Sequence, residues 1–564
     1  MGKKYSIPVI LAGAALVFHL FGGFAFIRSA APTYDETVHL SSGYSYLSTG
    51  LYRMNVMDHP PLSEMLSALP LMALKAQSFA GHPYFANLMP YHYGDLFLYQ
   101  NGPSPDKLLN TARGFTFLLW TALLLLFIWL FVSRLISPDA ALLSMAAALL
   151  MPVFISNDAL VTTDAAAAVF YFGSFALAWR FIDAAKPVEG KKPRPAALWG
   201  WAAAAGFTAG LGMAGKFSLF IVPPLVLAGW FAHDHFSRRM SAGRLAGFAA
   251  AYLAACLLAV ALVYKGDLGL YYDGLKATLT RLDQGRSSFA AGRYGVNGVW
   301  WYFPFALAVK TPLLTLFFAL VGIWAALKPF RRRALWLLLP PAFFLAVSLN
   351  TKVQIGYRHI MPVMPFLAVL AGAGLAAASR ARTGGWLLAG WFALTALSLS
   401  RVEPFYLAYF NELAGGPAKG YRSLVDSNLD WGQDVKALGS YLKGQGNPPV
   451  IFSYFGVARP ERYGVNYAPL GVVTNAPLDG GRADVCAMKR PLLAVSATNL
   501  QGTYYADHST FAWLKERKPV HVAGYSIFLY DLSGDKDGIE RLAALFDREG
   551  SNAEADCLYS LAGK

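Results

Sequence analysis

The chain has 564 residues, of which 56% are hydrophobic, 15% aromatic and only 14% charged. This apolar share lies well above that of a soluble protein, so the composition predicts an integral membrane protein. The formal net charge is +15, but the basic residues recur between apolar segments, where they orient membrane proteins. A nucleic-acid partner is therefore not expected.

The first apolar segment, 7–27, follows a basic start and is long enough to span a bilayer. A basic start and the small residues Ser29, Ala30 and Ala31 are also typical of a cleaved signal peptide. We interpret the segment as a first transmembrane helix because its apolar run is longer than a signal peptide requires.

Further apolar segments have the length of a membrane span, which gives about eleven transmembrane helices. They are 113–133, 139–155, 160–182, 197–214, 217–234, 245–264, 308–327, 334–349, 360–378 and 385–400. Basic residues lie on alternate connections, which predicts a cytoplasmic N-terminus. These residues are Lys3, Lys4, Arg134, Lys186, Lys191, Lys192, Arg194, Arg238, Arg239, Arg244, Lys328, Arg331, Arg332, Arg333, Arg380 and Arg382.

This topology divides the chain into a transmembrane domain, 1–400, and an extracytoplasmic C-terminal domain, 401–564. The transmembrane domain carries the outer loops 28–112, 265–307 and 350–359. The C-terminal domain mixes strand-like and helix-like runs, which predicts a small α/β or α+β fold. The strand-like runs are 450–454, 492–495 and 525–530, and the helix-like runs are 434–443 and 539–546.

Two cysteines, Cys486 and Cys557, lie in the C-terminal domain. They can pair if the compartment is oxidising, but the sequence does not give their distance. The chain contains no P-loop, Rossmann glycine motif, zinc-ligand spacing or nucleophile elbow. A mechanism that uses a soluble nucleotide therefore has no visible site.

Carboxylates gather just after the first span. Asp35 and Glu36 begin an aromatic stretch that predicts a helix lying at the membrane surface. Asp58 and His59 precede Pro60-Pro61, which would hold both on a rigid corner. A carboxylate at the water edge of a bilayer can act as a general base, and we favour this role for Asp35 over the alternative of a simple helix cap.

Basic residues on the same side are the candidate phosphate ligands. Lys216 lies between two spans, Arg358 begins a span, and Lys265 directly follows one. A guanidinium can hold phosphate with two hydrogen bonds, whereas a lysine can also merely reach toward lipid headgroups. Asp164, at the start of a span, and His359, next to Arg358, are further candidates.

The segment from Asp426 to Asp434 places oxygen-bearing side chains at positions 1, 3, 5 and 9 of a calcium loop. Trp431 and Ala437 stand where such a loop needs glycine and glutamate, so we favour a turn that leads into a helix.

In their order and topology these residues resemble a known family. Asp35-Glu36, Asp58-His59-Pro60-Pro61, Thr163-Asp164, Lys216 and Gly356-Tyr357-Arg358-His359 are similar to the polyprenyl-phosphate-dependent glycosyltransferases with the membrane-embedded C-type fold. The resemblance covers residues 1–400 and is nearest to the bacterial protein O-mannosyltransferases and the lipid A aminoarabinose transferase. It implies a bacterial plasma membrane protein with its active site on the outer face.

The resemblance also implies roles for single residues. The donor would be a polyprenyl-phosphate sugar, Asp35 the base that deprotonates an acceptor hydroxyl, and Lys216 and Arg358 the ligands of the leaving phosphate. His59 stands where the aminoarabinose transferase has a lysine, and a neutral imidazole is a weaker anion ligand. Other C-type enzymes use a divalent cation, and the pair Asp35 and Asp164 leaves room for one.

The acceptor stays open among protein, lipid and glycan. A transporter or flippase of lipid-linked sugars is the alternative, but transporters tend to carry their charges at the bilayer midplane, whereas here the charges gather at one face. A structural envelope protein would leave the acidic loop unexplained.

Overall fold

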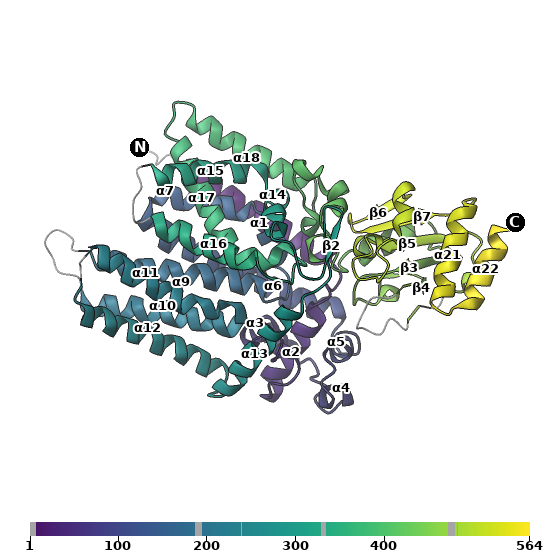
Figure 1. The fold of residues 1–564 in the computed structure, drawn as a ribbon, viewed down its shortest axis with the longest axis horizontal. Coiled ribbons are helices and arrows are strands. Elements are labelled where there is room, and N and C mark those ends of the chain that lie inside the picture. The colour runs from purple at the N-terminus through teal and green to yellow at the C-terminus, as the bar shows by residue number, and fades with distance from the viewer. Residues whose placement is uncertain are drawn as a thin grey trace.

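The computed structural model describes residues 7–186, 194–237, 240–328, 334–471, 480–481 and 483–563. Long helices fill most of the molecule, and a sheet flanked by α21 (Lys536–Arg548) and α22 (Asn552–Ala562) occupies the opposite end (Figure 1). The predicted combination of a helical membrane part with a C-terminal sheet-containing part is confirmed.

Every predicted span overlaps at least one helix. The helices are α1 (Ile7–Ser29), α6 (Pro105–Leu135), α7 (Pro138–Leu149), α8 (Pro152–Asn157), α9 (Asp164–Ala184), α10 (Pro195–Gly215), α11 (Val222–Ser237), α12 (Ala242–Val263), α14 (Tyr302–Lys310), α15 (Leu313–Leu327), α16 (Leu335–Ser348), α17 (Met364–Ala378) and α18 (Gly384–Ser400). Within the described ranges, 6 helices are long and apolar enough to cross a membrane, or up to 7 with the bent pair α14 and α15. The larger predicted number of spans and their orientation remain predictions.

Several of the basic residues that carry the orientation lie outside the described residues: Lys3, Lys4, Lys191, Lys192, Arg238, Arg239, Arg331, Arg332 and Arg333.

Prolines break two of the predicted spans. The span 308–327 is divided between α14 and α15, which meet at an angle of 113° next to Pro312. The span 139–155 ends at α7 and resumes as the short α8, which begins at Pro152. Proline lacks the amide hydrogen that would continue a helix, and its ring clashes with the preceding turn. The two breaks place non-helical backbone between α7 and α8 and between α14 and α15.

The outer loop forms α2 (Glu36–Thr49), α3 (Pro61–Ala68), α4 (Pro83–Ala86) and α5 (Pro90–Tyr99), and α13 (Leu268–Gln284) lies in the next outer loop. The predicted helix after Asp35 is confirmed. Other parts of the protein cover it, because α2 is buried from Glu36 to Tyr46, and its level at the membrane surface stays a prediction. Helices α3 and α5 pack on it closely. A Cβ atom at Gly43 would lie only 2.1 Å from the Glu64 carbonyl oxygen, so this contact requires glycine.

The C-terminal sheet has five strands in the order β4-β3-β5-β7-β6. Strand β3 is parallel to β4 and β5, whereas β7 is antiparallel to β5 and β6. The strands are β3 (Val450–Ser453), β4 (Tyr467–Pro469), β5 (Leu492–Ser496), β6 (His521–Ala523) and β7 (Ile527–Asp531), and α19 (Val435–Gly444) precedes them. The strand-like and helix-like runs of the sequence are thus confirmed.

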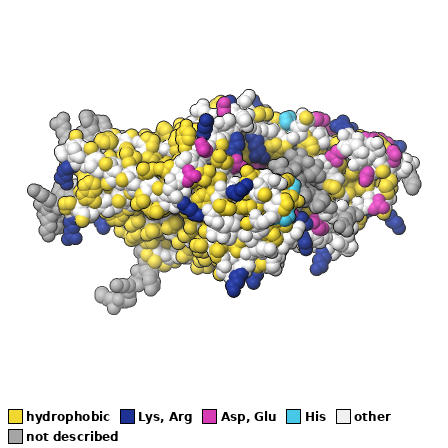
Figure 2. Space-filling view, turned by 90° about the horizontal axis from the view of Figure 1, so that it is seen from below, with side chains coloured by type: hydrophobic (Ala, Val, Ile, Leu, Met, Phe, Trp, Pro, Cys, Tyr) yellow, Lys and Arg dark blue, Asp and Glu magenta, His cyan; other side chains and the backbone are white. Residues whose placement is uncertain are grey.

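A disulfide joins Cys486, before β5, to Cys557 in α22. The pairing that the sequence left open is therefore present. On the molecular surface, hydrophobic side chains cover much of the helical part, and charged side chains gather toward the end that carries the sheet (Figure 2). This division is the one expected between lipid and water.

Candidate active site

Four side chains from four elements form one ion-pair cluster, which we call the acid–base cluster. Asp35 precedes α2, Asp164 begins α9, Lys216 follows α10, and Arg358 lies in the 3-10 helix Tyr357–Val363. The Arg358 Nη1 atom donates to Asp164 Oδ2 at 2.9 Å, and its Nη2 atom donates to Asp35 Oδ2 at 3.1 Å. Lys216 Nζ donates to the other oxygen of Asp164. The structure thus brings together four of the residues that the sequence singled out.

The four side chains differ in their access to solvent. Asp164 is fully buried and Arg358 is 9% exposed, whereas Lys216 is 20% and Asp35 25% exposed. Asp35 makes no side-chain capping bond to α2. Its carboxylate is thus the open acid of the cluster, and it is the one that a second molecule can reach.

Glu36, the neighbour of Asp35, lies in a closed site. Both of its oxygens accept hydrogen bonds from Arg113, and further bonds come from Thr33 and the Val161 amide. Burial alone would raise the pKa of Glu36, but the Arg113 charge and these bonds hold it below its usual range. A carboxylate that is saturated with donors cannot easily take a further proton, so this geometry favours a structural role for Glu36.

The corner before the two prolines separates Asp58 from His59. Asp58 is half-exposed and forms an ion pair with Arg281 of α13. The His59 ring instead packs edge-on against the His39 ring, with 4.7 Å between the ring centroids. Burial, the charge of His39 and that of Lys216 hold the pKa of His59 well below its usual range. His59 is therefore a neutral imidazole next to the cluster.

The remaining two candidates do not join the cluster. Lys265 donates to the Gly50 carbonyl oxygen at 2.9 Å and lies over the Tyr52 ring, on the exposed surface. Among the described residues, His359 takes part in none of the ion pairs that connect Arg358, Asp35, Asp164 and Lys216.

A buried histidine next to the cluster was not singled out from the sequence. His39 lies one helical turn after Asp35, and its Nδ1 atom is 2.8 Å from Glu64 Oε1, which also accepts from Asn55 at 2.6 Å. Burial alone would lower the pKa of His39, but the hydrogen bond and charge of Glu64 raise it. The spacing of four residues from Asp35 was the available signal, because it places both side chains on one face of a helix.

Arg113 was also missed, although a lone arginine inside an apolar run is itself a signal of a buried partner. A further cation, Arg286 in the loop 265–307, lies over the ring of Tyr504 from the C-terminal part.

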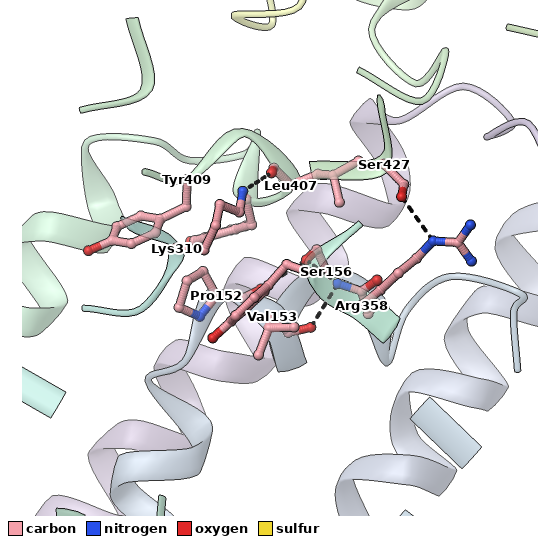
Figure 3. A pocket seen from close by; sticks show the side chains of 11 residues that line it. Pro152, Val153, Ser156, Lys310, Arg358, Leu407, Tyr409 and Ser427 are labelled. Atoms are coloured by element: carbon pink, nitrogen blue, oxygen red, sulfur yellow. Dashed lines mark hydrogen bonds between the residues drawn. The ribbon is translucent and has the colours of Figure 1, made fainter. Parts of the chain in front are cut away.

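A narrow pocket with a cavity volume of about 10 Å³ lies next to Arg358. It runs between α8, the end of α14 and the segment after α18, and Figure 3 shows Lys310 and Arg358 among its side chains. Lys310 Nζ donates to the carbonyl oxygens of Leu407 and Asn428, at 2.8 and 2.6 Å. A buried lysine thus ties the bend between α14 and α15 to the start of the C-terminal part.

In the described part of the chain, the carboxylates that the sequence offered as cation ligands have protein partners. The Arg358 guanidinium bridges Asp35 and Asp164, so this pair is not arranged to share a cation of its own. In the segment after Val425, Asp426 accepts from Tyr504, Asp430 from Thr498, and Asp434 from Ser526. No group of three or more His, Cys, Asp or Glu side chains in the described ranges is placed to hold a metal ion. The predicted turn leading into α19 is confirmed.

Residues 33–264 match the family described as dolichyl-phosphate-mannose-protein mannosyltransferase. A search of curated proteins found no match. Among solved structures, ArnT from Cupriavidus metallidurans bound to undecaprenyl phosphate is similar, at 12% identity and a TM-score of 0.48, over 93% of this chain and 97% of that one. AglB from Archaeoglobus fulgidus, an oligosaccharyltransferase in complex with an inhibitory peptide and a dolichol-phosphate, is similar at 12% identity and a TM-score of 0.47, over 76% of this chain and 58% of that one.

Both TM-scores are below 0.5, so neither likeness supports a functional assignment. The family match covers the outer loop, Asp164 and Lys216, and it favours an enzyme over the transporter alternative. Over residues 33–264 it confirms the predicted resemblance to the polyprenyl-phosphate-dependent glycosyltransferases, and with it the predicted class of enzyme.

Proposed function

We propose that this protein transfers a sugar, with inversion, from a polyprenyl-phosphate donor to an acceptor hydroxyl on the outer face of a bacterial plasma membrane. One observation carries this proposal. Arg358, whose guanidinium can bind a phosphate, pairs both with the accessible carboxylate of Asp35 and with the fully buried carboxylate of Asp164. The family match of residues 33–264 supports the donor class.

Asp35 acts as the general base. It accepts the proton of the acceptor hydroxyl while that oxygen attacks the anomeric carbon of the sugar. Among the three carboxylates at this site, Asp35 is the one with solvent access, since Glu36 and Asp164 are fully buried. The bond from the anomeric carbon to the phosphate oxygen breaks as the new bond forms, so the configuration inverts.

Arg358 and Lys216 stabilise the leaving group. The departing polyprenyl phosphate gains charge in the transition state, and positioned cations lower the barrier most when they meet charge as it develops. Asp164 holds both cations by one carboxylate, which fixes their separation. Neutral His59 would contribute a hydrogen bond rather than a charge, and Asp58, paired with Arg281, would support the corner.

The orientation follows from the predicted topology. The N-terminus would be cytoplasmic, and the cluster and the C-terminal part would face outward, where a lipid-linked sugar and an envelope acceptor meet. The sugar is a hexose or pentose, and the acceptor is a protein, lipid or glycan of the envelope.

The test is transfer by the purified protein in lipid vesicles that contain polyprenyl-phosphate sugars, with envelope lipids and proteins as acceptors. We expect the wild type to release polyprenyl phosphate and to form a product of inverted anomeric configuration, detected by mass spectrometry and NMR. Asp35→Asn should lower this rate about a hundredfold or more, because the amide keeps the size of the side chain but cannot accept the proton.

Asp273→Asn is the matched control, since Asp273 is an exposed acid of α13 on the same outer face. It should leave the rate unchanged. Near-normal transfer by Asp35→Asn would refute the assignment of the base and would redirect the search to Asp58 and His39.

A further inference from the structure

The segment Asp426–Asp434 belongs to the C-terminal part of the chain, yet it lies on the acid–base cluster and not in the sheet. The backbone amide of Tyr34 donates to the Trp431 carbonyl oxygen at 3.0 Å, and that of Ala31 donates to the Gln433 carbonyl oxygen at 2.8 Å. These bonds fix the stretch of outer loop that leads directly to Asp35. The segment therefore supports the backbone that leads to Asp35, and it also contacts Arg358.

Two side chains of the segment hold Arg358. Ser427 Oγ accepts from the Arg358 Nε atom at 3.0 Å and donates to the Ile355 carbonyl oxygen at 2.9 Å. The Trp431 ring lies beneath the guanidinium, with 4.0 Å from the Arg358 Cζ atom to the ring centroid. Together with the bonds to Asp35 and Asp164, these contacts fix the plane of the guanidinium and cover one of its faces.

The segment is itself held on both sides. Asn428 accepts from the Tyr357 amide at 2.8 Å and donates to the Tyr302 hydroxyl at 2.9 Å. Only 2% of the Trp431 surface is exposed. Farther along the chain, two ion pairs dock the C-terminal part on the outer loop, Arg459 with Asp95 and Lys436 with Asp106. The support of Arg358 is thus rigid and does not depend on one flexible contact.

We propose that the segment Asp426–Asp434 is part of the catalytic centre, and that Ser427 and Trp431 are positioning residues that keep Arg358 in place while it exchanges a carboxylate partner for the donor phosphate. This inference rests on the proposed function, because it assigns the phosphate to Arg358. The C-terminal part then completes the active site instead of serving as a separate accessory domain. Without Trp431 the guanidinium would keep its charge and its hydrogen bonds but lose the ring that covers one of its faces.

The experiment is a double-mutant cycle in the full chain, with Trp431→Ala, Arg358→Ala, their combination and Trp431→Phe. Binding of polyprenyl phosphate to the purified protein is the first measurement. We expect Arg358→Ala to weaken binding on the order of a hundredfold and Trp431→Ala about tenfold. In the Arg358→Ala background, Trp431→Ala should add little, because its effect acts through the arginine.

Two variants separate positioning from general damage. Trp431→Phe keeps an aromatic face and should restore most of the binding, whereas Trp513→Ala is the control. Trp513 also lies against an arginine, Arg517, within the C-terminal part, and should not change binding. Equal weakening by Trp431→Ala in both backgrounds would overturn the inference, and so would failure of Trp431→Phe to bind better than Trp431→Ala.

The second measurement is thermal unfolding, without ligand, of the wild type, the two single alanine variants and the double variant. The loss of stability in the double variant should be smaller than the sum of the single losses, because the two side chains are in contact. If the wild type failed to bind polyprenyl phosphate, the proposed function would be refuted together with the catalytic role of the segment, and the unfolding cycle would still show whether Trp431 supports Arg358. Additive losses there would overturn the inference.

Discussion

Asp35 and Glu36 are adjacent in the sequence, but they occupy opposite kinds of site. Asp35 is 25% exposed and shares one arginine with another acid, whereas Glu36 is fully buried and has an arginine of its own. The two side chains diverge because successive residues at the start of a helix point about 100° apart. One faces the opening of the cluster, and the other faces α6.

The comparison shows that the environment, more than the residue type, separates an accessible carboxylate from a closed one. An acid pair at a membrane edge is compatible with two bases, one base or none. Glu36 ties the end of α1 to α6, since Arg113 also donates to the carbonyl oxygens of Ala30 and Ala31. That network sets the position of the backbone from which Asp35 projects.

The largest expected effect is a loss of stability when the buried ion pair between Glu36 and Arg113 is broken. Glu36→Gln removes the negative charge but leaves Arg113 buried, and an unpaired buried charge costs about 3 to 5 kcal/mol of unfolding free energy. We expect a sharp loss of folded protein and a lower unfolding midpoint in detergent, whereas Asp35→Asn should unfold near the wild type. Wild-type stability of Glu36→Gln would mean that Arg113 finds other partners, and the contrast between the two acids would fail.

A third carboxylate sharpens the comparison, because it is buried but forms no ion pair within the described part of the chain. Asp430 accepts a hydrogen bond from the Thr498 amide, and burial raises its pKa to about 7. Since the unfolded group has a pKa of 3.8, the folded protein binds more protons between these values. Stability should thus be greatest below the lower value and should fall as the pH rises through the folded pKa.

Asp430→Asn should remove the part of this fall that Asp430 causes. The variant should match the wild type at low pH and exceed it at pH 8, by up to about 4 kcal/mol of unfolding free energy. Unfolding midpoints measured across the pH range would check this. A variant that is no more stable than the wild type at high pH would show that Asp430 is charged without a cation partner, against the lesson drawn from Glu36.

The parts of the fold that could be predicted are those set by local pattern. Long apolar runs predicted the helices of the membrane part, and short strand-like apolar runs predicted β3, β5 and β7. The acid–base cluster was accessible for a similar reason, because Asp164, Lys216 and Arg358 are charges at the ends of apolar runs, where a charge needs a partner.

The pairings themselves were not accessible. Arg358 meets Ser427 across 69 residues and Asp35 across 323 residues, and no local pattern records such a contact. The role of Trp431 could not be predicted, because the sequence around one tryptophan does not show which arginine will pack on its ring. The burial of α2 was missed for a related reason, since its aromatic residues suit a membrane surface as well as a protein interior.

The open site can be weakened without loss of charge. Arg358→Lys keeps a cation but cannot reach Asp35, Asp164 and Ser427 together, because an ammonium lacks the planar fork. We expect a fall in the maximal transfer rate of about tenfold, with weaker donor use. The check is the rate against donor concentration in purified protein. An unchanged maximal rate would mean that any cation suffices there, and that the arrangement around Arg358 is structural.

The smallest effect is expected at Lys265, the cation that the sequence grouped with Arg358 and the structure separates from it. Its Nζ atom donates to the Gly50 carbonyl oxygen and lies over the Tyr52 ring at an exposed position, so Lys265→Ala removes a surface contact only. The transfer rate should stay within about twofold of the wild type and the unfolding free energy within about 0.5 kcal/mol. Lys216→Ala is the matched comparison, since it removes the same side chain from inside the cluster. If Lys265→Ala lost as much activity as Lys216→Ala, the phosphate site would have to extend to the end of α2, and the division between open cluster and outer surface would be wrong.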